Sequence, residues 1–449
     1  MTTSTEKKAI QQQFQDRIDE EELLNCMRCG FCLPSCPTYI ESDFQESHSP
    51  RGRIALMKAV VDGMIEPDED VERSLELCLG CRACEPVCPS GVNYGHLLEE
   101  TRDILNQNKK HSFPTKLLRH LVFKGLFPHQ QRIRALTGMI GIYQRSGLQT
   151  VVRKTGILRI LPEHLAELES VLPSVPKMKQ AKKRPELLPA IGKRKIRVAF
   201  FTGCLMDTLF LNTNQATIKL LQMAGCEIII PKQQACCGAL HSHSGEKAQA
   251  ILLAKRNIQA FEDLHVDYII TNAGGCGAFL SEYDQLLKTD AEWQQRAKSF
   301  VHKLRDFSSI LLELNFQQQK LQLSNQVVTY QDSCHLRNVM KTFAEPRRLL
   351  HSIEGIEYRE MKNAHSCCGS AGIYNIVESR MSMKILDSKM ETVKSTQSTT
   401  IVTANPGCLL QMQLGIKRAG LSKQMRAVHL ADLLLEACHP STVSSSNYM

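Results

Sequence analysis

Eight cysteines near the start of the chain repeat one spacing twice. In each copy, three cysteines follow one another at intervals of three positions, and a fourth comes four positions later. The first run consists of Cys26, Cys29, Cys32 and Cys36, and the second run of Cys78, Cys81, Cys84 and Cys88. Three thiolates so placed in a tight loop can each reach a different iron of one [4Fe-4S] cube, which is how bacterial-type ferredoxins bind their clusters. The pattern therefore predicts electron transfer.

The fourth cysteine of each run is followed by a proline, Pro37 or Pro89, which turns its sulfur away from the three that precede it. We expect each fourth cysteine to bind the cube of the other run, as in two-cluster ferredoxins. One predicted cluster is held by Cys26, Cys29, Cys32 and Cys88, and the other by Cys78, Cys81, Cys84 and Cys36. The interval between the runs is too long for a simple hairpin, so helical segments are predicted there.

Two other uses of cysteine fit the pattern less well. Paired C-x2-C units also bind structural zinc, but a zinc site has no use for a third cysteine or for a doubled, proline-terminated run. Disulfides are not expected, because a chain of 449 residues with 43% hydrophobic residues can bury large cores without them. The polar start of the chain lacks an apolar signal segment, so all 18 cysteines are interpreted as reduced cysteines of a cytoplasmic protein.

Positive charge is concentrated in one segment. The formal net charge is +9, and residues 104–162 contain eleven Lys and Arg but no Asp or Glu. Residues 113–127 alternate apolar and basic positions at helical spacing, which predicts a basic amphipathic helix. Such a helix can lie on an anionic membrane, dock an acidic partner, or connect domains with a solvated cationic face. No apolar run reaches the ~18 residues of a membrane span, so membrane contact is expected to be peripheral, and no motif indicates nucleic acid as a partner.

A second cysteine pattern occurs twice in the rest of the chain. Each copy has a single cysteine, then a Cys-Cys-Gly unit, then another single cysteine. The first quartet is Cys204, Cys236, Cys237 and Cys276, and the second quartet is Cys334, Cys367, Cys368 and Cys408. The intervening lengths are 31 and 38 residues in the first copy and 32 and 39 in the second, counted from these positions. Such agreement predicts a duplicated structural unit.

Each copy has the pattern of an α/β domain. Strands are predicted in the first copy over residues 196–203, 226–231 and 267–274, with a helix over 215–225. The cysteines follow the strand ends, where α/β sheets place their sites. Each quartet can hold a further iron-sulfur cluster or a zinc ion, whereas buried structural thiols are the alternative. Cys226 and Cys438 have no counterpart in the repeat and are expected to be core residues.

Three charged or titratable residues near the cysteines are also of interest. Arg51 and Arg53 lie between the two runs, where positive charge can raise a cluster potential, although a salt bridge at a helix start would explain them nearly as well. His335, which follows Cys334, is expected to make a local hydrogen bond.

These features predict an α+β multidomain protein. A helical two-cluster ferredoxin-like domain (residues 1–110) is followed by a basic helical connector (111–195). The first Cys-Cys-Gly repeat (196–320) and the second repeat (321–449) then form a duplicated α/β domain.

The doubled ferredoxin run followed by two Cys-Cys-Gly repeats resembles the iron-sulfur subunit family of bacterial glycolate oxidase, over essentially the whole chain. The NAGGC and NPGC turns and the YQRSGLQ segment at residues 143–149 are similar as well. Lactate-utilisation, anaerobic glycerol-3-phosphate dehydrogenase and heterodisulfide reductase subunits share this architecture. Those relatives often carry a fifth cysteine per repeat, where this chain has Ala273 and Asn405. The departure counts against a noncubane cluster and favours the glycolate oxidase branch.

The resemblance implies an electron-transfer subunit of a glycolate oxidase (dehydrogenase) complex. FAD-containing flavoprotein subunits would oxidise glycolate to glyoxylate, and this chain would pass their electrons towards a quinone or another acceptor, in the cytoplasm or on the inner face of the cytoplasmic membrane. No flavin is expected in this chain, because no strand is followed by a G-x-G-x-x-G loop. We therefore expect no hydroxy-acid oxidation by the chain alone and assign it no catalytic residue.

Two alternative functions remain open at this stage. The partner can be an L-lactate or glycerol-3-phosphate dehydrogenase, because no residue of this chain needs to touch the substrate. The chain can also be a thiol catalyst like heterodisulfide reductase, in which the Cys236–Cys237 or Cys367–Cys368 pair cycles between dithiol and disulfide.

Overall fold

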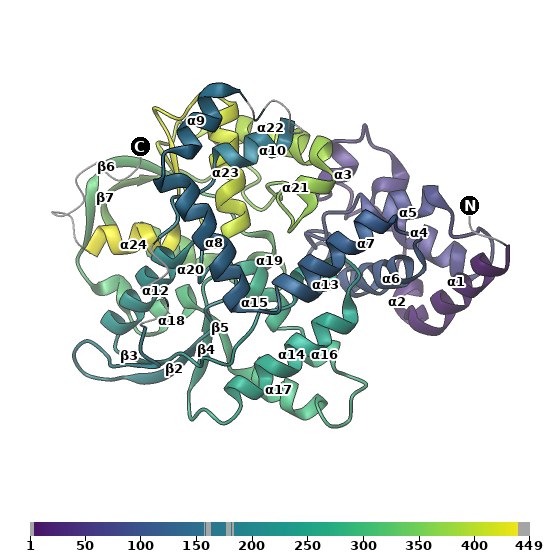
Figure 1. The fold of residues 1–449 in the computed structure, drawn as a ribbon, viewed down its shortest axis with the longest axis horizontal. Coiled ribbons are helices and arrows are strands. Elements are labelled where there is room, and N and C mark those ends of the chain that lie inside the picture. Colours follow the sequence, from purple (N-terminus) through teal and green to yellow (C-terminus); the bar gives the residue numbers. More distant parts are fainter. Residues whose placement is uncertain (1–3, 157, 159–162, 177–180, 182–183, 439–449) are drawn as a thin grey trace.

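A computed structural model describes residues 4–156, 158, 163–176, 181 and 184–438 of the chain. The two ends of the predicted domain organisation, and parts of the predicted connector, therefore lie outside the described residues. Figure 1 shows an N-terminal group of helices on one side, two α/β units on the other, and a helical connector that crosses between them. In the described part of the chain, no helix combines the length and the apolar character that a membrane crossing requires.

The N-terminal domain consists of short helices joined by the two cysteine loops. Its helices are α1 (Ser4–Arg17), α2 (Glu20–Leu24), α3 (Pro37–Ile40), α4 (Pro50–Val61), α5 (Glu69–Glu76) and α6 (Tyr94–Asn108), with a 3-10 turn at Glu46–His48. Helix α4 begins sharply because Pro50 occupies its first turn and the Ser49 side chain accepts a hydrogen bond from Gly52 N–H. Phe14, Met57 and Leu75 are fully buried between these helices. The helices predicted between the two cysteine runs are thus confirmed.

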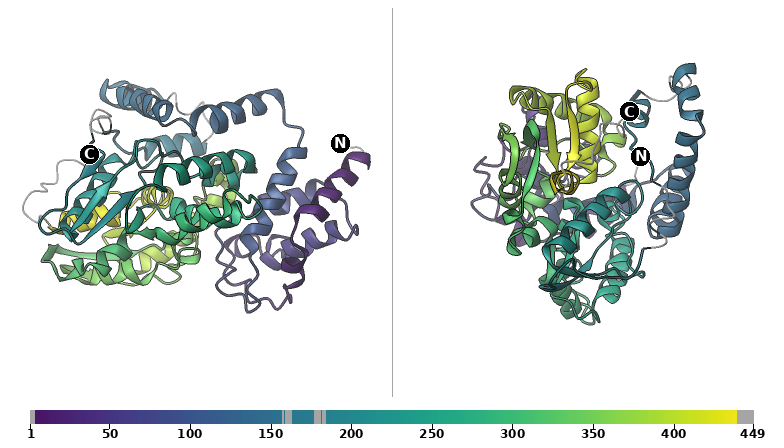
Figure 2. Two further views of the ribbon diagram at one scale, coloured as in Figure 1. Left: turned by 90° about the horizontal axis from the view of Figure 1, so that it is seen from below. Right: turned by 90° about the vertical axis from the view of Figure 1, so that its left-hand side faces the viewer.

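The connector is made of helices that lie along one side of both α/β units (Figure 2). These are α7 (Phe113–Arg119), a π-helical segment (His120–Leu126), α8 (Gln130–Arg145), α9 (Leu148–Thr155) and α10 (Glu163–Ser170). The amphipathic helix predicted over residues 113–127 is helical from Phe113 to Leu126, with a change from α to π winding at His120, and Phe127 lies in the turn that follows.

The first repeat is a five-stranded sheet with helices packed against it. Its strands are β1 (Leu187–Leu188), β2 (Ile196–Phe200), β3 (Cys226–Ile229), β4 (Tyr268–Thr271) and β5 (Leu304–Asp306), in the order β1-β3-β2-β4-β5. All pairs are parallel except β1 with β3. Its helices are α12 (Leu211–Ala224), α13 (Ala239–His243), α14 (Lys247–Phe261), α15 (Gly274–Leu280), α16 (Tyr283–Leu286), α17 (Gln294–Lys303) and α18 (Phe307–Glu313).

The second repeat is a four-stranded, fully parallel sheet in the order β7-β6-β8-β9. Its strands are β6 (Leu321–Tyr330), β7 (Ile353–Tyr358), β8 (Thr400–Thr403) and β9 (Arg426–His429). Its helices are α19 (Cys334–Asn338), α20 (Ala344–His351), α21 (Tyr374–Val377), α22 (Ser379–Ser395), α23 (Pro406–Arg418) and α24 (Leu430–Cys438). All four residues of β8 are buried, as expected for a parallel strand covered on both faces.

The two repeats share one hydrophobic core. Helix α12 of the first repeat packs against α24 of the second, and the hydroxyl of Thr213 donates a hydrogen bond to Asp432 (2.8 Å). Near the cysteines, Gly274 N–H donates to Ala404 O (3.0 Å), so the corresponding loops of the two repeats meet directly. The repeats therefore form a single structural unit.

The fold class predicted from the sequence is confirmed, with helices in the N-terminal domain and two parallel-rich sheets in the repeats. The strands predicted over residues 196–203, 226–231 and 267–274 correspond to β2, β3 and β4. Cys226 is fully buried in β3, as predicted for a core residue, whereas Cys438 is half-buried at the end of α24.

Candidate iron-sulfur centres

The first cysteine run forms an open loop between α2 and α3. Cys29 is exposed, and Cys26 and Cys32 are half-buried. Two apolar side chains of the same loop, Met27 and Phe31, are 67% and 66% exposed. The first run therefore brings its thiols close to the molecular surface, beside an apolar patch.

The second cysteine run is covered. It lies between α5 and α6, and Cys78, Cys81 and Cys84 are all buried. The Arg102 guanidinium donates to Cys78 O (2.5 Å), which fixes the start of the loop. Two donors point at the Cys78 sulfur: Gly80 N–H (3.3 Å) and the Tyr94 hydroxyl (3.5 Å). Hydrogen bonds of this kind to a ligating sulfur favour the reduced state of a cluster.

Both loops use left-handed backbone at the same two places but exchange the residue types. Between the first and second cysteine, Arg28 (φ 54°) corresponds to Gly80 (φ 63°). Between the second and third, Gly30 (φ 87°) corresponds to Arg82 (φ 57°). Glycine adopts this conformation without strain, whereas arginine does so at a cost. Each loop therefore holds one strained arginine, which indicates that the loop shape is imposed by the function of the cysteines rather than by local preference.

Arg53 is a fully buried cation beside the second run. Its guanidinium donates to Ser74 O (2.7 Å) and to the Thr38 hydroxyl (3.1 Å). Burial alone would raise the pKa of the Cys78 thiol, but the positive charges of Arg53 and then Arg102 lower that pKa below its ordinary value. A thiolate, the form that binds iron, is thus favoured at Cys78. Arg51 instead pairs with Glu46 (2.7 Å) and donates to Arg28 O (3.0 Å), so it braces the first loop.

Cysteines of both runs meet in one cluster. Cys78 and Cys84 of the second run are buried in it, and Cys26, Cys32 and Cys88 pack against it. A cavity of the first loop is lined by sulfur-bearing residues from both runs: Cys26, Cys29, Cys32, Cys84 and Cys88. Eight thiols on two interlocked loops, with backbone and side-chain donors aimed at sulfur, fit a pair of iron-sulfur cubes.

The first quartet lies beyond the ends of β2 and β3 and at the start of α15. Its thiols touch in a row, from Cys204 to Cys236, from Cys236 to Cys237, and from Cys237 to Cys276. Gly238 has φ +93°, which allows the sharp turn after the adjacent cysteines.

The second quartet repeats this arrangement. Cys334 touches Cys367, and Cys368 touches both Cys367 and Cys408. Asn405, where related proteins have a fifth cysteine, donates a hydrogen bond to the Cys408 sulfur (3.6 Å). The amide therefore takes up part of the space and polarity of the absent thiol.

Neither quartet has the geometry of a single-ion site. Within the described residues, no three His, Cys, Asp or Glu side chains converge as ligands of one metal ion. A zinc ion needs four ligands at about 2.0–2.3 Å around one point, whereas these thiols form a line of neighbours.

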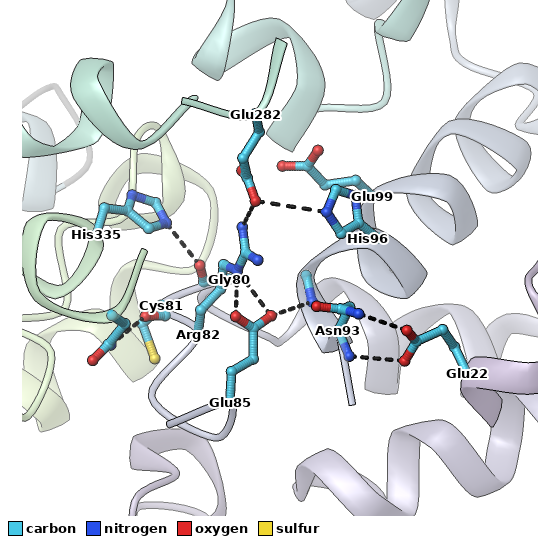
Figure 3. Close-up of polar contacts among 12 residues, drawn as sticks. Glu22, Gly80, Cys81, Arg82, Glu85, Asn93, His96, Glu99, Glu282 and His335 are labelled. Carbon is cyan, nitrogen blue, oxygen red and sulfur yellow. Dashed lines mark hydrogen bonds and ion pairs between the residues drawn. The ribbon is translucent and has the colours of Figure 1, made fainter. Parts of the chain in front are cut away.

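The second run and the second quartet meet through a contact that spacing does not predict. Cys81 packs in one buried cluster with Cys367, although 286 positions separate them in the sequence. His335 Nε2 hydrogen-bonds to Gly80 O (3.0 Å), and Asn338 donates to Cys81 O (2.9 Å). Figure 3 shows the imidazole of His335 directed at this loop. The hydrogen bond expected of His335 is thus made, but to another domain.

On its other side, the second loop is held to the first repeat by an ion-pair cluster (Figure 3). Arg82 pairs with Glu85 (2.8 Å) and with Glu282, which is also 3.7 Å from His96. Burial raises the pKa of Glu282, although the charge of Arg82 opposes this. Glu99, a neighbour on α6, pairs with His243 (2.9 Å). These residues gave no signal in the sequence, because charged residues at a domain interface look like ordinary surface residues.

Comparison with known families gives three matches along the chain. The 4Fe-4S dicluster domain matches residues 22–92, which implies two [4Fe-4S] clusters. The linker region of the glycolate oxidase iron-sulfur subunit matches residues 114–172. The cysteine-rich domain matches twice, over residues 198–281 and 328–413.

Several individual proteins are similar over long stretches. The probable glycolate oxidase iron-sulfur subunit of Bacillus subtilis (strain 168) is 71% identical over 98% of this chain and 100% of its own length. The glycolate oxidase iron-sulfur subunit of Escherichia coli (strain K12) is 32% identical over 92% of this chain and 94% of its own length. Lactate utilization protein A of Geobacillus sp. (strain WCH70) is 31% identical over 53% of this chain and 99% of its own length.

A solved structure shares the fold. The crystal structure of a hypothetical protein from Helicobacter pylori has a TM-score of 0.52 and 11% identity, covering 98% of this chain and 78% of that one. At this identity the likeness concerns the fold alone. With a matching linker, a dicluster domain, two cysteine-rich domains and full-length similarity to two such proteins, the chain belongs to the glycolate oxidase iron-sulfur subunit family.

Proposed function

We propose that this chain is the electron-transfer subunit of a glycolate oxidase complex. It would take electrons from FAD-containing flavoprotein subunits that oxidise glycolate to glyoxylate, and pass them towards a quinone or another acceptor. The observation that carries the proposal is the packing of the two cysteine runs into one cluster, with Cys84 and Cys88 of the second run lining the cavity of the first loop. Full-length similarity to glycolate oxidase iron-sulfur subunits supports the choice of complex.

The ligands in this proposal are the crossed sets, Cys26, Cys29, Cys32 and Cys88 for one cluster and Cys78, Cys81, Cys84 and Cys36 for the other. When bound, each cluster would supply a site that stores one electron. The residues around the sets differ in what they contribute. Exposed Met27 and Phe31 offer an apolar contact for a partner subunit beside the first set, while Arg53 and Arg102 hold positive charge beside the second.

The complex can be tested by purifying it from its native cell without air. We expect about eight irons per chain, co-purifying flavoproteins, and a reduced-cluster signal in electron paramagnetic resonance when glycolate is added. L-lactate and glycerol 3-phosphate serve as matched substrates, because they separate the glycolate assignment from its two alternatives. A preparation with fewer than about eight irons per chain, or one whose clusters no hydroxy acid or polyol reduces, would contradict the relay.

We also propose that the connector places the complex on an anionic membrane surface. Between residues 113 and 155 the chain has eight Lys and Arg and no Asp or Glu. The same segment exposes large apolar side chains on α7, α8 and α9 and on the π-helical segment: Phe113, Leu117, Leu118, Leu121, Leu136, Met139, Ile142, Leu148 and Val151. Exposed apolar residues among cations are the composition of a helix that lies at a lipid interface. In Figure 2 these helices run along one side of the molecule, where they can meet a flat surface together.

Flotation with lipid vesicles tests this surface. The full chain should float with vesicles containing phosphatidylglycerol and much less with pure phosphatidylcholine, and a variant carrying Leu117→Ser with Leu121→Ser should lose most of the bound fraction. Leu252→Ser is the matched control, since Leu252 is also 59% exposed but lies on α14 of the first repeat. Equal flotation of all three proteins would contradict membrane docking. If vesicle binding is absent and the double variant instead loses its flavoproteins, the surface belongs to the partner subunit.

A further inference from the structure

The two repeats are nearly equal in sequence pattern but unequal in their contact with the N-terminal domain. Cys367 and Cys236 hold equivalent positions, each the first cysteine of a Cys-Cys-Gly unit, and they are 1% and 2% exposed. Cys236 packs in a buried cluster with Cys204 and Cys237 of its own quartet. Cys367 packs in a different buried cluster, which contains Cys81 of the second run and has Cys334 of its own quartet against it. The internal symmetry of the repeats is thus broken at one sulfur.

The contact is part of a tightly packed junction. Leu79, Cys81 and Ala83 of the second run share one buried hydrophobic cluster with Cys367 and Tyr374 of the second repeat. Three hydrogen bonds hold the loop's backbone against that repeat, from His335 to Gly80 O, from Asn338 to Cys81 O and from Tyr374 to Leu77 O (2.9 Å). Because these bonds fix the main chain on both sides of Cys81, the sulfur contact is set by the fold and does not depend on one flexible side chain.

A sulfur in contact with a cluster ligand changes the free energy of reducing that cluster. If the neighbour is a thiol, its hydrogen bond stabilises the extra negative charge of the reduced state. If the neighbour is a metal-bound thiolate, its charge opposes reduction. In either state the effect is strong here, because both sulfurs are buried and water does not screen them.

We propose that Cys367 couples the second repeat to the ferredoxin-type site that contains Cys81, so that the second quartet and not the first senses and tunes the redox state of that site. This inference rests on the proposed function, since it needs the site to carry a cluster. Cys367 acts through Cys81 and is therefore a positioning residue. The junction also places a cysteine of the N-terminal domain in one buried cluster with a cysteine of a repeat, which offers a path from that domain towards the second quartet.

A redox titration followed by electron paramagnetic resonance tests the coupling. The full chain is prepared without air as wild type, Cys367→Ala, Cys367→Ser and Cys236→Ala, and the iron content of each is measured. We expect Cys367→Ala to shift the midpoint potential of one of the two N-terminal clusters, Cys367→Ser to bring it back towards the wild-type value, and Cys236→Ala to shift neither. A negative shift identifies Cys367 as a thiol donor and a positive shift identifies it as a charged thiolate, and both support the coupling.

Two outcomes of this titration would contradict the coupling. Unchanged potentials in Cys367→Ala, or equal shifts in Cys367→Ala and Cys236→Ala, would overturn the inference. If Cys367→Ala loses iron, the comparison is made between Cys367→Ser and a Cys236→Ser variant at equal iron content. A wild-type chain that lacks about eight irons or both signals would instead refute the proposed function, so the two failures are told apart before any variant is compared.

Discussion

The two cysteine runs have the same spacing but opposite surroundings. The first run keeps Cys29 at the surface, beside exposed Met27 and Phe31. Three of the four cysteines of the second run are buried, and its loop is fixed against both repeats by hydrogen bonds and by the Arg82 ion pairs. The same cysteine pattern therefore occurs once near the surface, where a partner subunit could contact it, and once where the repeats of this chain cover it. In the proposed relay, this difference would give electron transfer a direction, from the open site to the covered one.

The largest expected effect comes from removing a ligand of the covered run. Cys81→Ala should lose about four of about eight irons and abolish electron delivery through the complex, because a cube needs its thiolates. Cys226→Ala is the matched control, since Cys226 is also fully buried but lies in β3 away from both runs. Iron analysis and glycolate-dependent acceptor reduction measure the two effects. Full iron content in Cys81→Ala would remove Cys81 from the ligand set.

Arg53 and Arg51 allow a buried cation to be compared with a partly exposed one. Arg53→Ala should destabilise the protein by about 3–5 kcal/mol, because it strips a buried charge partner from Cys78 and leaves the Ser74 carbonyl and Thr38 hydroxyl without their donor. Arg51→Ala should cost about 1 kcal/mol or less, since its pair with Glu46 is partly exposed. Denaturant unfolding under argon compares the two variants. Equal losses would show that burial does not distinguish the two sites.

Glu99 of α6 contributes to the attachment of the N-terminal domain to the first repeat. Burial would raise the pKa of Glu99, but hydrogen bonds from His243 and Ser242 lower this pKa to about 2. A carboxyl whose pKa is depressed on folding stabilises the protein above its unfolded value near 4.5, and that stabilisation is lost as the pH falls towards 2. Glu99→Gln should therefore cost up to about 3 kcal/mol at pH 7, and less and less as the pH falls below about 4.5. Denaturant unfolding of both proteins at each pH measures this, and a difference that does not change with pH would exclude Glu99 as its source.

The smallest effect concerns the strained arginines of the two loops. Arg28→Gly should stabilise the open loop by about 1 kcal/mol, because glycine adopts φ 54° without the clash of a side chain. Arg82→Gly should not be stabilising, although Arg82 has almost the same φ, since it also removes the pairs with Glu85 and Glu282. Thermal unfolding measures both variants. The melting temperature should rise for Arg28→Gly and fall for Arg82→Gly if the ion pairs of Arg82 stabilise the protein by more than its backbone strain costs.

Much of the site could be predicted because its determinants are local. A cube restricts the distances between neighbouring ligands, so the spacing of Cys26, Cys29 and Cys32 is visible in the sequence itself. The strands of the repeats were predictable for a similar reason, because a parallel strand such as β8 is buried along its whole length and consists of β-branched residues around an Ile-Val pair. The fold class and the family followed from these two kinds of signal.

The remaining features depend on how the domains pack against one another, and the spacing of residues in the sequence carries no information about that packing. The packing of Cys81 against Cys367 requires two domains to dock in one orientation, and no residue near either cysteine in the sequence predicts it. Arg82 and Glu282 look like ordinary surface charges in the sequence, yet they form a largely covered pair between the same loop and the first repeat. The sequence allowed the same two explanations for Arg51 and Arg53. Only the burial of Arg53 shows that it is the arginine that holds positive charge beside the second run.

The anchoring of the N-terminal domain has a kinetic consequence. Arg102 and Asn106 of α6 bind backbone carbonyls of the first repeat, at His243 and Gly245, while Tyr374 of the second repeat binds Leu77 O. If the chain carries electrons as proposed, a domain held at both flanks would do so from a fixed position, without moving between donor and acceptor. Within the complex, turnover should then be insensitive to added viscogen, in contrast to carriers that must tumble between sites.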